Sequence, residues 1–303
     1  MAESLRQSSL SEVVLSLTRL VRPHQWYKQA VMLFGIVFSR NLFDVAAWLD
    51  LLVGIVSFTA IASAAYIFND INDVEEDRRH PQKQHRPLAS GQVSPRLAAG
   101  LASVLAGIGL VSGYHSGPLF FAVLCVYVVQ NLAYSLYLKR LLHVDILVVA
   151  MGFVLRAVAG VVAISVFLSP WLIVSTFLLA LVLALGKRRH ELSVAVEPSE
   201  TRHVLAKYSE EHVDQLLVVT MSTLLMAYSL YTFSRTDPLM VSTLPFAFFG
   251  VFRYHYLVSA EDAAGQPESV FTDTPSVVNL VLWGLITVAI LYGSVEIPSG
   301  VIG

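Results

Sequence analysis

Residues 51–77 read LLVGIVSFTAIASAAYIFNDINDVEED, and the uncharged run Leu51–Phe68 leads directly into an acidic cluster. An α-helix needs about 20 apolar residues to cross the hydrocarbon of a bilayer. The run therefore predicts a transmembrane helix with carboxylates at one end. This pattern decides the fold class, because similar runs recur along the whole chain.

Further charge-poor segments occur along the chain, one of them shorter and two of them long enough for two crossings. They are Gln25–Phe38, Leu97–Leu138 (two crossings, broken at residues 112–118), Asp145–Gly186 (two crossings, broken at residues 165–170), Gln215–Ser234, Pro238–Phe252 and Thr274–Val295. Together with the first run they predict nine transmembrane helices. We therefore expect an all-α integral membrane protein, with residues 1–303 forming a single membrane domain.

Composition excludes several other classes of protein. Of the 303 residues, 55% are hydrophobic and 14% are charged, whereas a soluble domain carries about 25% charged residues. This excludes a soluble enzyme and a disordered chain, and a net charge of −2 gives no basic surface for nucleic acid. The membrane is the expected partner, and the sequence leaves a homo-oligomer open.

The distribution of Lys and Arg predicts the orientation. If the N-terminus is cytoplasmic, 17 of the 20 cations fall on the inner side; Arg40 and Arg235 lie outside and Arg156 lies within a crossing. Positive charge concentrates in cytoplasmic loops. Residues 69–94 and 187–214 are then cytoplasmic loops that cap the helices and carry the polar residues of a site.

The acidic cluster is the best candidate for chemistry. Asp70, Asp73 and Asp77 are spaced i, i+3 and i+7, which places them on one face if the helix continues past Phe68. A solvated helix end is the simpler interpretation. The alternative is Mg²⁺, which takes one or two carboxylates together with water and substrate phosphates, and Asn69 adds a neutral oxygen. Lys83 and Arg86, which follow within ten residues, favour a diphosphate ligand.

Other cations have two interpretations. Lys28, Lys139, Lys187 and Arg188 either bind phosphate or lie at the membrane surface. Arg156 is expensive inside a crossing, so a functional role is the default, and a structural ion pair is its alternative. With Asp145, three helical turns earlier, Arg156 predicts a polar stripe that lines a cavity open to the cytoplasm.

The pattern Asn69-Asp70-x-x-Asp73-x-x-x-Asp77 after a transmembrane helix resembles the first aspartate motif of the UbiA prenyltransferase superfamily. The resemblance implies a UbiA-like bundle, Mg²⁺ and polyprenyl substrates.

Five further stretches are similar to one branch of that superfamily, the decaprenyl-phosphate phosphoribosyltransferases: Arg22-Pro23-x-Gln25-Trp26-x-Lys28, His80-Pro81-x-Lys83-x-x-Arg86-Pro87, Leu155-Arg156-Ala157-x-Ala159-Gly160, Gly186-Lys187-Arg188-x-x-Glu191 and Phe252-Arg253-Tyr254. The branch implies transfer of 5-phosphoribose from phosphoribosyl diphosphate to a polyprenyl phosphate, for cell-wall precursor synthesis. It implies a plasma-membrane enzyme whose active site faces the cytoplasm.

One departure from the wider superfamily supports this branch. Enzymes that prenylate aromatic acceptors carry a second Asp-x-x-x-Asp motif after the sixth crossing, where this chain has Lys187-Arg188-Arg189-His190-Glu191. A basic replacement suits a donor with an additional phosphate. The nearest acidic approximation, Glu210-x-x-x-Asp214, comes later in the loop.

These observations give a hypothesis for each residue. Asp70, Asp73 and Asp77, with Asn69, hold Mg²⁺ on the donor diphosphate, and Lys83 and Arg86 neutralise the leaving diphosphate. Lys187 and Arg188 bind the 5-phosphate. Arg156, Lys28 and Lys139 orient the lipid phosphate, and Tyr134 is a further candidate for substrate binding. The alternatives are a UbiA-type prenyltransferase, which moves a polyprenyl group to an aromatic or lipid acceptor, and a membrane transporter.

Overall fold

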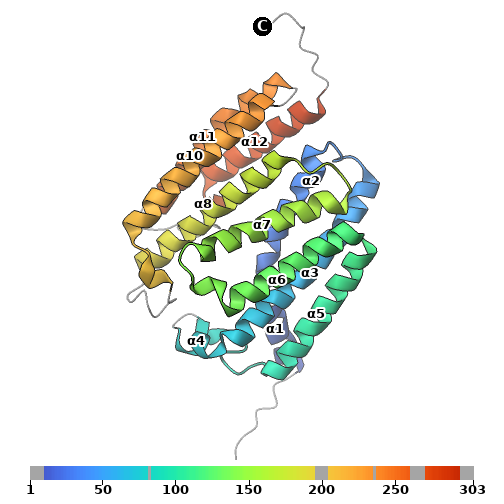
Figure 1. The fold of residues 1–303 in the computed structure, drawn as a ribbon, viewed down its shortest axis with the longest axis vertical. Coiled ribbons are helices and arrows are strands. Elements are labelled where there is room, and N and C mark those ends of the chain that lie inside the picture. The colour runs from blue at the N-terminus through green and yellow to red at the C-terminus, as the bar shows by residue number, and fades with distance from the viewer. Residues whose placement is uncertain (1–9, 81–82, 195–203, 235–236, 260–269, 294–303) are drawn as a thin grey trace, which may run out of the picture. The chain divides into compact units, whose positions relative to one another are not determined.

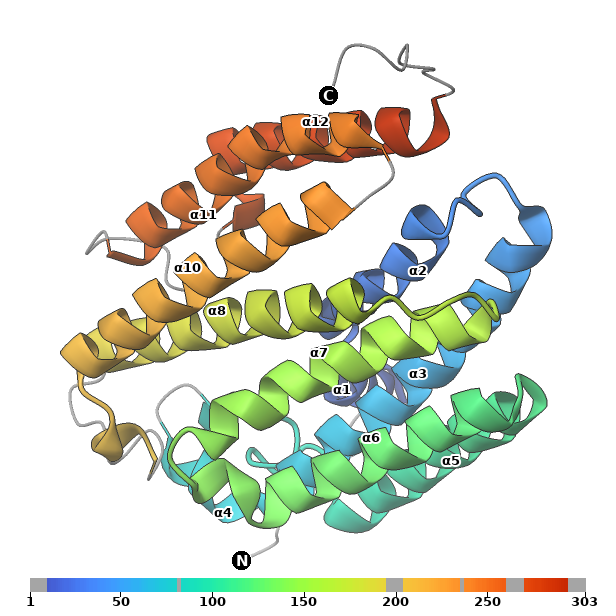
Figure 2. The same ribbon diagram turned by 45° about the horizontal axis from the view of Figure 1, so that its top comes forward.

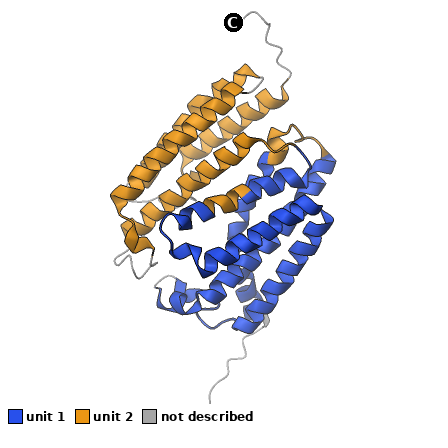
Figure 3. Cartoon of the chain, viewed as in Figure 1, with its two compact units in different colours: residues 1–34, 45–148, 155–166 blue, residues 35–44, 149–154, 167–303 orange. Residues whose placement is uncertain are grey.

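The computed structural model describes residues 10–80, 83–194, 204–234, 237–259 and 270–293, and these are helical with short connections (Figure 1). The chain divides into two compact units (Figure 3). The first comprises residues 1–34, 45–148 and 155–166, and the second comprises residues 35–44, 149–154 and 167–303.

The first unit contains, wholly or in the main, six α-helices and three 3₁₀ helices. The α-helices are α1 (Leu10–Val21), α3 (Val45–Asn72), α4 (Val74–Arg79), α5 (Pro95–His115), α6 (Pro118–Leu136) and α7 (Val144–Ala163). The 3₁₀ helices are η1 (Pro23–Met32), η2 (Lys83–His85) and η3 (Leu138–Arg140). Helix α2 (Leu33–Phe38) leads into the second unit. That unit also contains α8 (Pro170–Val194), η4 (Leu205–Lys207), α10 (Glu210–Ser234), η5 (Pro238–Thr243), α11 (Leu244–Ser259) and α12 (Thr274–Tyr292).

Seven of the described helices are long and apolar enough to cross a membrane: α3, α5, α6, α7, α8, α10 and α12. The fold is thus all-helical as predicted, but nine crossings are not confirmed. The predicted segment Gln25–Phe38 divides into η1 and the six-residue α2, and Pro238–Phe252 divides between η5 and the 16-residue α11. Gln25, Lys28 and Gln29 make the first of these segments too polar for a regular apolar span. The cytoplasmic N-terminus stays a prediction.

Both predicted breaks within long apolar runs are confirmed. Helix α5 ends at His115 and α6 begins at Pro118, and α7 ends at Ala163 and α8 begins at Pro170. Proline suits the first turn of a helix, where its missing N–H has no partner to lose. Gly117, with φ +123°, supplies a backbone conformation that other residues rarely adopt.

Helix α3 is the centre of the first unit, with α5 and α6 beside it (Figures 1 and 2). Small residues allow the close contact, because a Cβ added to Gly109 of α5 would lie 2.8 Å from the backbone oxygen of Ser57. Ser57 also donates a hydrogen bond to Ser112 (2.7 Å). This packing holds the middle of α3 against α5.

The loop between η2 and α5 is anchored by apolar side chains. Leu88 and Val93 pack with Leu20 of α1 and Ile67 of α3 in one buried cluster. The Val93 N–H also donates to the backbone oxygen of Pro87 (3.0 Å). This anchoring holds Arg86, the residue before Pro87, beside the end of α3.

In the second unit, α8 lies beside α10, and α11 lies beside α10 and α12 (Figure 2). Asp273 caps α12 by accepting the N–H of Ser276 (3.0 Å), and it forms a two-point ion pair with Arg253 of α11 (2.6 and 3.0 Å). The Tyr292 hydroxyl accepts the Leu42 N–H (3.0 Å), which ties the segment after α2 to α12.

Candidate active site

The acidic cluster lies where α3 ends and α4 begins. Helix α3 continues beyond Phe68 to Asn72, as the spacing of the aspartates requires. Asp73 interrupts the regular helix (φ −100°, ψ 7°). Helical hydrogen bonds still cross the junction, from Asp73 N–H to Asn69 (3.0 Å) and from Asp77 N–H to Asp73 (2.8 Å).

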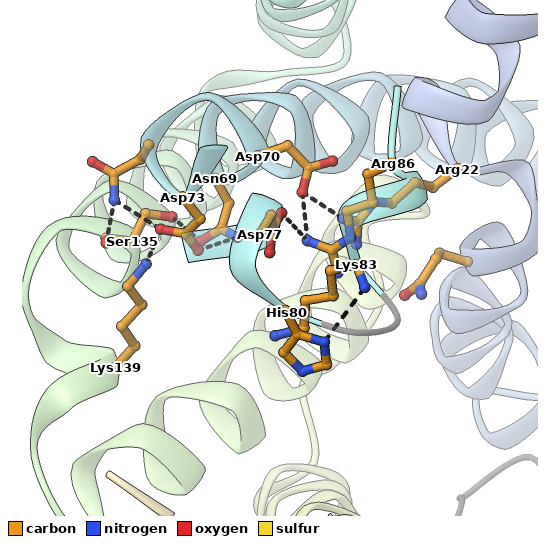
Figure 4. A network of polar contacts seen from close by, with 12 residues as sticks. Arg22, Asn69, Asp70, Asp73, Asp77, His80, Lys83, Arg86, Ser135 and Lys139 are labelled. Carbon is orange, nitrogen blue, oxygen red and sulfur yellow. Dashed lines mark hydrogen bonds and ion pairs between the residues drawn. The ribbon is translucent and has the colours of Figure 1, made fainter. Parts of the chain in front are cut away.

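Asp70 and Asp77 converge on one guanidinium group (Figure 4). They are buried, with 2% and 4% of their surface exposed. Arg86 Nη1 donates to Asp70 Oδ1 (3.0 Å) and to Asp77 Oδ2 (2.7 Å), and Arg22 Nη2 also donates to Asp70 Oδ1 (2.5 Å). The fixed fork of arginine suits such shared pairing with carboxylates.

Asp73 belongs to a separate group of contacts (Figure 4). Its carboxylate pairs with Lys139, which follows α6, and accepts hydrogen bonds from Asn69 and Asn72 (3.0 Å each). The Ser135 hydroxyl donates to Asn69 Oδ1 (3.0 Å). The three aspartates therefore divide into two groups, because the helix is interrupted at Asp73: Asp70 and Asp77 share Arg86, whereas Asp73 pairs with Lys139.

Within the described chain, no group of three or more His, Cys, Asp or Glu lies close enough together to hold a metal ion. Mg²⁺ needs only one or two protein carboxylates, and two are present. Asp70 Oδ1 and Asp77 Oδ2 both lie within 3.0 Å of the same nitrogen of Arg86. Two oxygen donors that already meet at a cation fit a hard divalent metal.

Arg22 and Tyr66 complete this region, and the sequence did not single out either as a candidate. The guanidinium carbon of Arg22 lies 5.5 Å, and Lys28 Nζ lies 6.0 Å, from the centroid of the Tyr66 ring. Lys28 also donates to Gln25 Oε1 (2.5 Å). Tyr66 stands one helical turn before Asp70, so the i, i+4 spacing could have indicated it.

The remaining candidates of the first unit are spread around this site. Lys83 follows the buried His80, whose Nδ1 accepts the Lys83 N–H (3.4 Å). Tyr134 is half-buried on α6, next to Ser135.

Arg156 is buried among protein groups, with 4% of its surface exposed. Its Nε donates to Gln29 Oε1 (3.0 Å) and its Nη2 donates to the Tyr127 hydroxyl (2.7 Å). Its guanidinium lies over the rings of Phe58 and Tyr127 (5.5 and 5.0 Å). Asp145, the other member of the predicted stripe, is also buried.

Lys187 and Arg188 belong to the second unit and lie within α8, which continues to Val194. Lys187 is exposed, whereas Arg188 is buried and pairs with Glu191. Arg189 contacts both Glu210 (3.0 Å) and Asp214 (2.9 Å). Residues 195–203 of the predicted loop 187–214 lie outside the described residues.

Comparison with known proteins gives the family. The UbiA prenyltransferase family model matches residues 30–273. The decaprenyl-phosphate phosphoribosyltransferase of Mycolicibacterium smegmatis is 33% identical, over 85% of this chain and 86% of its own length. The protein of that name from Corynebacterium glutamicum is 30% identical, over 90% and 86%.

A solved structure gives the fold. A UbiA homologue from Archaeoglobus fulgidus, determined with GPP and Mg²⁺, superposes with a TM-score of 0.72 at 17% identity, covering 91% of this chain and 99% of that one. Sequence and fold thus agree, and this chain is an enzyme that belongs to the UbiA prenyltransferase family.

Proposed function

We propose that this enzyme transfers 5-phosphoribose from phosphoribosyl diphosphate to a polyprenyl phosphate, with release of diphosphate. The observation that carries the proposal is the meeting of two buried carboxylates with two guanidinium groups at the end of α3. Carboxylates suit a metal and guanidinium groups suit phosphate. Relatives with the corresponding name, 33% and 30% identical over most of the chain, support the substrate pair.

Mg²⁺ is the proposed cofactor, and its presence with GPP in the Archaeoglobus fulgidus homologue supports this choice. Asp70 and Asp77 would hold it, with Asp73 and Asn69 beside them. The metal would neutralise negative charge on the donor diphosphate. Arg22, Lys83 and Arg86 would bind the phosphate oxygens and stabilise the charge that develops as diphosphate leaves.

The lipid phosphate is the proposed nucleophile. It is anionic at neutral pH, so no general base is required. One of its oxygens forms a bond to the anomeric carbon of ribose as the bond from that carbon to the diphosphate oxygen breaks, with inversion. Lys28, Lys139 and Tyr134 would orient it. The assignment of Lys187 and Arg188 to the 5-phosphate stays a prediction from the sequence.

We further propose that the enzyme lies in the plasma membrane with this site facing the cytoplasm. The seven apolar helices support a multi-pass membrane protein, and the concentration of Lys and Arg on one predicted side supports the orientation.

A UbiA-type prenyl transfer from a polyprenyl diphosphate is the second candidate. The homologue bound to GPP and Mg²⁺ favours it, because the same carboxylates and cations would serve a prenyl diphosphate. The transporter interpretation has no comparable support, since this is a family of enzymes.

The test uses the purified protein in detergent with radiolabelled phosphoribosyl diphosphate, a polyprenyl phosphate and Mg²⁺. Label should move into the organic phase, and EDTA or Asp77→Asn should abolish the transfer. Glu75→Gln is the matched control, because exposed Glu75 pairs only with Arg78 among the ion pairs described. Folded protein that transfers no label to lipids of several lengths would refute the proposal, and prenyl diphosphates with aromatic acceptors would then be tested.

A further inference from the structure

The segment that leads from α1 into η1 has a backbone that needs external support. Arg22 has φ 59° and ψ 60°, in the left-handed region, and Pro23–Met32 forms a 3₁₀ helix of 10 residues. Runs of 3₁₀ helix beyond about four residues are uncommon, and a non-glycine residue in the left-handed region is strained. Contacts with the rest of the unit must therefore hold this segment.

Helix α7 provides these contacts from one face. Arg156 donates to Gln29 (3.0 Å), which is buried, and it is itself fixed by the Tyr127 hydroxyl and by two aromatic rings. One turn later, a Cβ added to Gly160 would lie 2.2 Å from the backbone oxygen of Met32 and 2.7 Å from its Cα. The segment thus lies directly against the backbone of α7.

The same segment carries two of the cations at the candidate site. Arg22 reaches Asp70, and Arg22 and Lys28 both lie against the ring of Tyr66. Lys28 is the residue before Gln29. A shift of the segment away from α7 would therefore move both cations relative to the end of α3.

We propose that Arg156, Gln29 and Gly160 are positioning residues, which hold Arg22 and Lys28 at the phosphate-binding site. Arg156 then acts through Gln29, without contacting the lipid phosphate that the sequence assigned to it. This inference rests on the proposed use of Arg22 and Lys28 as phosphate ligands. It adds a function for the side of α7 that faces η1.

The experiment measures binding of inorganic diphosphate, in the presence of Mg²⁺, to the purified protein by calorimetry. Gly160→Ala and Gln29→Leu should each weaken binding about tenfold, the effect of losing about one charge-assisted hydrogen bond to an anion. Arg156→Lys should match Gln29→Leu, and the two changes together should cost no more than either alone. Gly107→Ala is the control, because an added Cβ there has nothing within 4 Å.

A second background separates positioning from general damage. In the Arg22→Met/Lys28→Met protein, Gly160→Ala and Gln29→Leu should have no further effect on diphosphate binding. Wild-type affinity in both single variants, or an equal further loss in that background, would overturn the proposal. So would a loss with Arg156→Lys that Gln29→Leu does not reproduce, since Arg156 would then bind the anion directly. If the Gly160→Ala protein fails to fold, the diphosphate affinity of Gln29→Leu alone tests the proposal.

This assay is independent of the transfer reaction. Diphosphate binding that responds to the variants as predicted, in a protein that transfers no phosphoribose, would contradict the proposed substrate and leave the positioning role intact. Transfer activity combined with unaltered diphosphate binding in the variants would contradict the positioning role alone.

Discussion

Replacing Arg86 by methionine should destabilise the protein, because this one side chain neutralises two buried carboxylates. Asp70 retains Arg22, whereas Asp77 loses the ion pair described for it. Loss of one partner of a buried ion pair costs about 3–5 kcal/mol, and exposed pairs contribute about 0–1 kcal/mol. The Arg86 side chain is 29% exposed, so we expect a cost between these limits, about 2–3 kcal/mol.

Thermal unfolding in detergent, followed by tryptophan fluorescence, measures this cost. The entropy of unfolding is about 2.1 cal/mol/K per residue, so the expected loss corresponds to a fall in Tm of about 3–5 °C for a chain of this length. Adding Asp77→Asn should restore part of the loss, because it removes the unpaired charge. Mg²⁺ should raise the Tm of Arg86→Met more than that of the wild type, since the Arg86 guanidinium then no longer competes with the metal for Asp70 and Asp77.

Arg78→Met is the matched control. Arg78 pairs with Glu75 on α4 in an exposed i, i+3 contact and donates to the backbone oxygen of Ala89 (3.3 Å), so its loss should change stability by about 1 kcal/mol or less. Equal falls in Tm for Arg86→Met and Arg78→Met would refute the reasoning. So would an additive effect of Asp77→Asn and Arg86→Met, because the two residues would then not be coupled.

Three further predictions concern other parts of the chain. The hydrogen bonds from Arg253 and Ser276 hold the pKa of Asp273 below its usual range. The stabilising contribution of Asp273 is therefore present above about pH 4 and is lost as the pH falls further. The Tm difference between wild type and Asp273→Asn should shrink from pH 6 to pH 3, and a constant difference would contradict this. Gly186→Ala would place a Cβ 2.1 Å from the Tyr254 hydroxyl oxygen and should cost about 1–3 kcal/mol; adding Tyr254→Phe should recover part of the lost Tm, and no recovery would show that this contact is not responsible. Gly109→Ala, which meets the backbone of Ser57, should lower the Tm more than Gly113→Ala, which meets the flexible end of Leu124; the reverse order would contradict the packing of α3 against α5.

The sequence predicted most accurately the features of the fold that depend on nearby residues, such as the start and end of a helix. The uncharged run ending at Phe68 became α3, and prolines mark the starts of α6 and α8. The segment before Phe38 could not be predicted in this way. The last residue of η1, Met32, lies against Gly160, which comes more than 100 residues later in the chain, and such a contact leaves no local signal in the sequence.

At the candidate site, the sequence identified several residues that the structure brings together but not their pairings. The acidic spacing identified Asp70, Asp73 and Asp77, and proximity in sequence suggested Arg86. Arg22 and Lys139 lie 48 and 66 residues from the aspartates they contact. Such distant pairings depend on tertiary packing, and the interruption of the helix at Asp73 decides which carboxylate meets which cation.

The sharing of one arginine by two aspartates means that a single movement of Arg86 changes the charge balance of both carboxylates. A ligand that draws Arg86 away from Asp77 also removes it from Asp70, because both carboxylates contact the same nitrogen. Asp70 would still pair with Arg22, whereas Asp77 would be left open to a divalent ion. Binding of a phosphate oxygen by Arg86 would then favour binding of a metal at Asp77, and each ligand would raise the affinity for the other.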